Sequence, residues 1–196
     1  MERAGATTLK GNPFTLVGPE LKAGDTAPDF TLVDVGLKAV SLKDTGSNVR
    51  IISVVPSLDT PVCDAQTKRF NEEAASLPGV DILTVSMDLP FAQKRWCGAF
   101  GVDKVKMLSD HKDGSFGSNY GTLIKELRIE SRAIFVVDQQ NKVRHGVVRC
   151  LHGSQERRGD PQLCHTDEVA CRCEDHHHRR PQRQWHPSVP GRLGET

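Results

Sequence analysis

A strongly apolar run that ends just before a helix-forming run limits what this chain can fold into. Residues 50–55, Arg-Ile-Ile-Ser-Val-Val, carry apolar side chains on both faces of a predicted strand, as in parallel sheets covered on both sides. The segment Pro-Ser-Leu-Asp-Thr-Pro-Val-Cys links this strand to a helix predicted over residues 63–77. Cys63 therefore stands where a strand ends and a helix begins.

Further predicted strands and helices alternate along the chain. We predict hairpins over residues 7–17 and 30–42, strands over 80–86, 104–109, 132–138 and 143–148, and helices over 91–100 and 116–123. Such alternation is typical of an α/β sheet with helices on its faces. In these folds reactive groups gather beyond the carboxyl ends of the strands, and Cys63 lies at such a place.

Charge and hydropathy exclude several classes of partner. The net charge of +1 and the pI near 7.7 give no general attraction to nucleic acid or to an acidic membrane. No apolar run approaches the roughly 18 residues of a membrane span, and the N-terminus lacks the apolar region of a secretory signal. We therefore expect a cytoplasmic protein, in a compartment where cysteines are more often catalytic or metal-binding than structural.

The setting of Cys63 favours redox chemistry. The unpaired N–H groups and the dipole at the start of a helix favour the thiolate, which is the reactive form of cysteine. Thr60 can place its hydroxyl beside the sulfur, and Arg132, which opens a later strand, can reach it across the sheet. Cys97 lies on another helix and suits a thiol that meets an oxidised Cys63 after local unfolding. Without the strand-to-helix setting, the two cysteines would be interpreted as small buried core residues. Thr60 would be an ordinary loop residue and Arg132 an ordinary surface residue.

From about residue 7 to 143 the chain closely resembles the bacterial thiol peroxidases, the atypical two-cysteine peroxiredoxins. The matching stretches are Thr-Leu-Lys-Gly-Asn-Pro at 8–13, Gly-Asp-Thr-Ala-Pro-Asp-Phe at 24–30, Ser-Val-Val-Pro-Ser-Leu-Asp-Thr-Pro-Val-Cys at 53–63, Ser-Met-Asp-Leu-Pro-Phe-Ala at 86–92, Arg-Trp-Cys at 95–97 and Arg-Ala-Ile-Phe-Val-Val-Asp at 132–138.

This resemblance implies a thioredoxin-like α/β fold of the peroxiredoxin type, with an N-terminal β-hairpin, and a homodimer. It implies reduction of hydrogen peroxide and organic hydroperoxides, with thioredoxin as the reductant and without a metal or an organic cofactor. Cys63 matches the peroxidatic cysteine of the family and Cys97 the resolving one, paired within one subunit. Thr60 and Arg132 match the residues that activate peroxide.

The family pattern ends after about residue 143. The last 52 residues contain no lysine, yet they hold four of the six cysteines and seven of the eight histidines. We predict a peroxiredoxin domain over residues 1–148 and a disordered tail over 149–196. We interpret the change as a reading-frame shift, an interpretation that resequencing would refute if it confirmed the tail and the tail's peptides were found in cells.

Two other functions compete with the peroxidase. A disulfide oxidoreductase of the thioredoxin type needs Cys-x-x-Cys at the helix start, but Asp-Ala-Gln follows Cys63. A non-catalytic redox or metal-binding module would use the cysteines and histidines of the tail, whose spacing fits no paired zinc pattern. That module predicts stoichiometric zinc and no peroxide turnover.

Overall fold

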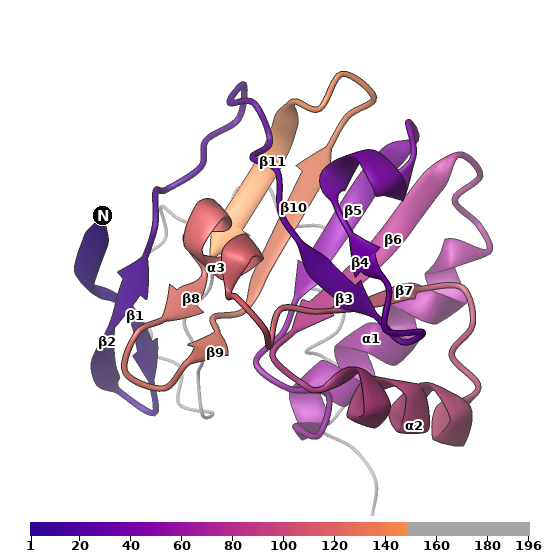
Figure 1. Ribbon diagram of the computed structural model, residues 1–196, viewed down its shortest axis with the longest axis horizontal. Helices are drawn as coiled ribbons and strands as arrows, with labels where there is room; N and C mark the ends of the chain where they lie inside the picture. Colours follow the sequence, from indigo (N-terminus) through magenta and orange to yellow (C-terminus); the bar gives the residue numbers. More distant parts are fainter. Residues whose placement is uncertain (149–196) are drawn as a thin grey trace, which may run out of the picture. The chain divides into compact units, whose positions relative to one another are not determined.

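Two β-sheets and three α-helices make up residues 1–148, the part of the chain that this computed structural model describes (Figure 1). In chain order the elements are β1 (Glu2–Leu9), β2 (Asn12–Val17), β3 (Leu32–Asp34), β4 (Ala39–Val40), the 3₁₀ helix η1 (Leu42–Thr45), β5 (Val49–Val54), α1 (Pro61–Ala74), β6 (Val80–Ser86), α2 (Pro90–Phe100), β7 (Lys106–Ser109), α3 (Ser115–Tyr120), β8 (Leu123–Ile124), β9 (Ile129–Glu130), β10 (Ala133–Val137) and β11 (Val143–Val148).

The larger sheet has seven strands in the order β11-β10-β5-β6-β7-β3-β4. Strand β6 is parallel to both β5 and β7, and the other neighbours are antiparallel. The smaller sheet has the order β1-β2-β8-β9 and is antiparallel throughout. The predicted α/β alternation and the N-terminal hairpin are therefore confirmed.

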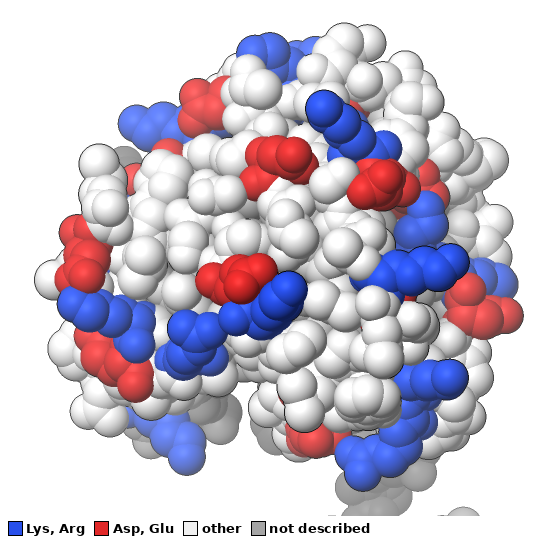
Figure 2. Space-filling model, viewed as in Figure 1, with Lys and Arg blue, Asp and Glu red and all other residues white. Residues whose placement is uncertain are grey.

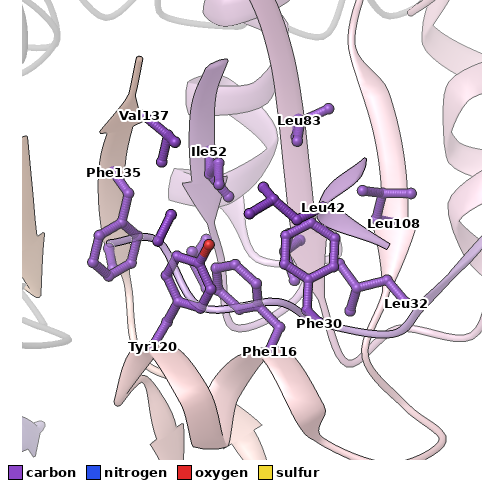
Figure 3. Close-up of a cluster of buried hydrophobic side chains, with 14 of the residues drawn as sticks. Phe30, Leu32, Leu42, Ile52, Leu83, Leu108, Phe116, Tyr120, Phe135 and Val137 are labelled. Carbon is purple, nitrogen blue, oxygen red and sulfur yellow. The ribbon is translucent and has the colours of Figure 1, made fainter. Parts of the chain in front are cut away.

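Side chains of the central strands alternate between two hydrophobic clusters. On β5, Ile52 packs into a cluster with α3, whereas Ile51 on the opposite face packs against the cluster that α1 and α2 cover. Figure 3 shows the first cluster, in which Phe30, Phe116 and Tyr120 bring aromatic rings against the sheet. The rings of Phe116 and Tyr120 are stacked with centroids 4.1 Å apart. Helices on both faces thus bury the continuous apolar run that the sequence showed.

The predicted boundaries agree with the structure for two strands and differ from it by a few residues in other elements. Strands β6 and β11 have the predicted bounds, whereas α1 begins at Pro61 instead of residue 63 and ends at Ala74 instead of residue 77. Proline suits the first helical position because its missing N–H would be unpaired there in any case. Strand β1 begins at Glu2, five residues before the predicted hairpin.

One predicted helix was partly wrong. The helix expected over residues 116–123 is α3, which ends at Tyr120 because Gly121 follows with φ of 69°, a conformation that glycine adopts readily. Leu123 then begins β8, which pairs with β9 and β2 and extends the N-terminal hairpin into the second sheet. The predicted tail over residues 149–196 lies outside the described residues. Within residues 1–148, none of the helices is long and apolar enough to cross a membrane.

Candidate active site

Cys63 lies in the first turn of α1, just beyond the carboxyl end of β5. The residue before the helix is Thr60, whose extended backbone and side chain form the N-cap. Thr60 Oγ1 accepts the N–H of Cys63 at 3.4 Å, which is the usual role of an N-cap hydroxyl. The Cys63 side chain is fully buried. The local sequence thus places the thiol at the positive end of a helix dipole.

Two hydrogen-bond donors meet at the Cys63 sulfur. Thr60 Oγ1 donates to Sγ at 2.7 Å, and Arg132 Nη2 donates to it at 3.3 Å. Arg132 directly precedes β10, which pairs antiparallel with β5 and thereby comes to the same edge of the sheet. A guanidinium and a hydroxyl thus direct two hydrogens at one sulfur, where they can bind atoms that carry negative charge. The structure therefore brings three of the four predicted site residues together.

Gln66, to which the sequence analysis assigned no role, orients the arginine. Its Oε1 accepts a hydrogen bond from Arg132 Nη1, and its Nε2 donates to Ser53 Oγ at 2.8 Å. Gln66 follows Cys63 by three residues and therefore lies on the same side of α1. The three-residue spacing from Cys63 was the feature of the sequence that could have identified Gln66 as a site residue. Gln66, itself fixed to β5 through Ser53, thus holds one nitrogen of the guanidinium while the other contacts the sulfur.

Asp88 braces the loop before Cys63 and was also missed. Its Oδ1 accepts from Ser57 Oγ at 2.7 Å, and its Oδ2 accepts from the Leu58 N–H at 2.8 Å and from Ser86 Oγ at 2.9 Å. Asp88 lies between β6 and α2, so the loop that carries Thr60 is tied to the segment that leads to Cys97. The sequence placed Asp88 in a family motif but gave no sign of its partners.

Cys97 lies on α2, apart from this group of donors. Both Cys63 and Cys97 are free thiols, so this is the reduced form of the pair. The side chain of Cys97 is half-buried, and burial raises the pKa of its thiol. Burial thus disfavours the thiolate of Cys97, which is its nucleophilic form, while α2 remains folded.

The described residues contain no group of three or more His, Cys, Asp or Glu side chains that could hold a metal ion. The cysteines and histidines of the tail, on which the metal-binding alternative rests, lie outside the described part of the chain. Figure 2 shows acidic and basic side chains interspersed over the face in view.

Comparison with known proteins shows the family to which the chain belongs. The Redoxin family model matches residues 22–152. A thiol peroxidase of Bacillus subtilis is 60% identical over 136 residues, which are 69% of this chain and 81% of that protein. A thiol peroxidase of Halalkalibacterium halodurans is 59% identical over 136 residues, 69% of this chain and 82% of that protein. The chain belongs to the thiol peroxidase family.

Solved structures place this thiol peroxidase family member among the peroxiredoxins. It is 45% identical to a peroxiredoxin-like protein from Aquifex aeolicus, with a TM-score of 0.69 and coverage of 75% of this chain and 86% of that chain. A thiol peroxidase from Chromobacterium violaceum is 23% identical, with a TM-score of 0.66 and coverage of 74% and 85%, and supports the fold alone. The predicted thioredoxin-like fold of the peroxiredoxin type is confirmed.

Proposed function

We propose that this chain reduces hydrogen peroxide and organic hydroperoxides, with Cys63 as the peroxidatic thiolate. The observation that carries the proposal is the pair of donors, Thr60 Oγ1 and Arg132 Nη2, on a buried sulfur at a helix start. A cysteine that only fills a core needs neither donor. Membership of the thiol peroxidase family makes the chain a thiol-dependent peroxidase and disfavours the non-catalytic alternative.

In the first step the Cys63 thiolate attacks one peroxide oxygen and forms an S–O bond. The O–O bond breaks, and the leaving oxygen takes a proton to become water or an alcohol. Thr60 and Arg132 stabilise the negative charge that develops on this oxygen, since both already direct hydrogens into the space around the sulfur. Cys63 leaves this step as a sulfenic acid.

In the second step the Cys97 thiol attacks the sulfenic sulfur, a disulfide forms within the subunit and water leaves. The two thiols lie on separate helices, and we propose that local opening of α1 and α2 accompanies this step. Thioredoxin, or another dithiol reductant, then reduces the disulfide in the cytoplasm. No metal or organic cofactor takes part in this sequence.

A homodimer is the assembly we propose for the enzyme. The N-terminal ends of α1 and α2 carry exposed apolar side chains, namely Val62, Leu89 and Phe91, and a second copy of the chain can cover them. Sedimentation or light scattering of the purified chain tests this point, and a monomer at all concentrations would refute it.

The test of the function is peroxide consumption by the full chain with thioredoxin, thioredoxin reductase and NADPH. We expect turnover in the wild type and none in Cys63→Ser. Cys97→Ser is the matched control, because it should consume only about one to two peroxides per chain, as Cys63 passes to the sulfenic and then the sulfinic acid, and then stop. A chain that is folded by circular dichroism but consumes no peroxide would refute the proposal.

A further inference from the structure

A hydrogen bond joins α1 and α2 at the residues next to both cysteines. Asp64 follows Cys63 in α1, and Trp96 precedes Cys97 in α2. Trp96 Nε1 donates to Asp64 Oδ1 at 3.1 Å. The indole is only 5% exposed, so this bond sits at the edge of a packed contact between the two helices.

A second contact, one turn further along both helices, reinforces the first. Lys68 Nζ forms an ion pair with Asp64 Oδ2 at 2.8 Å and lies 3.4 Å from the centroid of the Phe100 ring. The rings of Phe100 and Trp96 are 5.3 Å apart. We call these four residues, Asp64, Lys68, Trp96 and Phe100, the interhelix latch. Both oxygens of the Asp64 carboxylate are thus used within it.

Formation of the Cys63–Cys97 disulfide would change the contact between α1 and α2 that the latch holds. Successive residues of an α-helix point about 100° apart, so Cys97 points in a different direction around α2 from Trp96, whose indole faces Asp64 in the first turn of α1. Bringing Cys97 to Cys63 requires α2 to rotate or unwind at this position. That motion withdraws Trp96 Nε1 from Asp64 and leaves both groups to find other partners.

We propose that Asp64 and Trp96 are positioning residues that set how fast Cys97 reaches the oxidised Cys63. The inference rests on the proposed function, because it concerns the second step of that reaction. A sulfenic acid on Cys63 has two fates. It can condense with the Cys97 thiol, releasing water, or it can react with a second peroxide, which leaves as water or an alcohol while Cys63 becomes a sulfinic acid.

The strength of the latch therefore decides how much enzyme is lost to over-oxidation. A closed latch keeps α2 folded against α1 and thereby delays the approach of the Cys97 thiol to Cys63. Removing the hydrogen bond to the Asp64 carboxylate should speed disulfide formation about tenfold, given the usual strength of a partly exposed hydrogen bond to a charged group. The sulfinic fraction at a given peroxide concentration should fall by a similar factor.

The decisive variant is Trp96→Phe, which removes the N–H donor and keeps an aromatic ring. Wild type and variant are treated in the full chain with one equivalent of hydrogen peroxide, quenched at intervals and alkylated. Peptide mass spectrometry then follows the Cys63–Cys97 disulfide, and a peroxide titration gives the ratio of sulfinic acid to disulfide. The rate of Cys63 oxidation should not change.

Three further variants separate the hydrogen bond from other effects. Asp64→Ala removes both the hydrogen bond and the charge and should behave as Trp96→Phe does in the second step. Asp64→Asn keeps an acceptor oxygen without the charge, so its rate of disulfide formation should lie between those of wild type and Asp64→Ala. The double variant of Trp96→Phe and Asp64→Ala should exceed neither single change. Arg69→Ala is the matched control, because the ion pairs of Arg69 stay within α1, and it should leave the partition unchanged.

The outcomes are distinct. Faster disulfide formation in Trp96→Phe and Asp64→Ala, with an intermediate rate in Asp64→Asn and a rate near wild type in Arg69→Ala, supports the latch. Equal or slower disulfide formation in folded Trp96→Phe and Asp64→Ala overturns it while leaving the peroxidase intact. A wild type whose Cys63 does not react with peroxide overturns the proposed function, and this inference with it.

Discussion

Replacing Glu130 with glutamine is expected to stabilise the fold at neutral and alkaline pH. Glu130 ends β9 and is fully buried, and Thr122 Oγ1 donates to its Oε2. Burial raises the pKa of Glu130 to about 8, and the negative charge of the neighbouring Asp110 acts in the same direction. Asp110 is itself held by the N–H of Gly117 at 2.8 Å, so it cannot swing away from Glu130.

The direction in which stability changes with pH follows from the protons that Glu130 binds in the folded and in the unfolded chain. The ordinary value for the Glu130 carboxyl is 4.5, so between pH 4.5 and about 8 the folded chain binds a proton that the unfolded chain releases. The stability contributed by this group is complete below pH 4.5 and is lost as the pH rises through about 8. The difference between about 8 and 4.5, at 1.36 kcal/mol per pH unit, is about 5 kcal/mol.

A glutamine side chain at position 130 is neutral at every pH, like the protonated Glu130 carboxyl, and its amide oxygen can still accept the hydrogen bond from the Thr122 hydroxyl. Chemical denaturation under reducing conditions should therefore show Glu130→Gln within about 1 kcal/mol of wild type at pH 5 and about 3–5 kcal/mol more stable at pH 8.5. Glu72→Gln, an exposed substitution on α1, controls for the loss of a negative charge. A difference between Glu130→Gln and wild type that is the same at pH 5 and pH 8.5 would refute the reasoning.

Three other predictions follow from the same structure. Arg132→Lys keeps the charge but not the fork that bonds both Cys63 and Gln66, so stopped-flow oxidation of Cys63 should slow about 10²–10³-fold; a change within twofold would contradict this. Asp88→Ala removes three hydrogen bonds around the active-site loop and should lower the free energy of unfolding by about 2 kcal/mol as well as the peroxide rate, whereas loss of stability alone would count against the bracing role. Gly121→Ala has φ of +69° and would place Cβ 1.9 Å from a backbone oxygen, so thermal unfolding should show a loss of about 3 kcal/mol or more.

Much of the active site could be predicted from the sequence because it is local. Thr60 and Cys63 belong to one helix cap, and an N-cap threonine followed by proline specifies their relative placement. The apolar run before them predicts a buried strand, and β5 is that strand. The local sequence pattern also predicted a helix over residues 91–100 that contains Cys97, and α2 is that helix.

Contacts between distant elements could not be predicted in this way. Asp88 and Gln66 look like ordinary polar residues, and their roles depend on partners supplied by other segments of the fold. Strands β8 and β9 have two residues each, too few for an alternating pattern to show. They exist because neighbouring chain segments pair with them.

The sequence by itself determined that a cysteine follows a buried strand and opens a helix, since both elements depend on side chains close together in the chain. Only the tertiary structure decided that Arg132, 69 residues away, contacts that sulfur, and that Glu130 is buried beside Asp110. The physical reason is that a period of two residues tells which face of a strand is buried but not which strand lies beside it. Strand order and register determine which strands are neighbours, and they therefore determine which charged side chains surround Cys63 and Glu130.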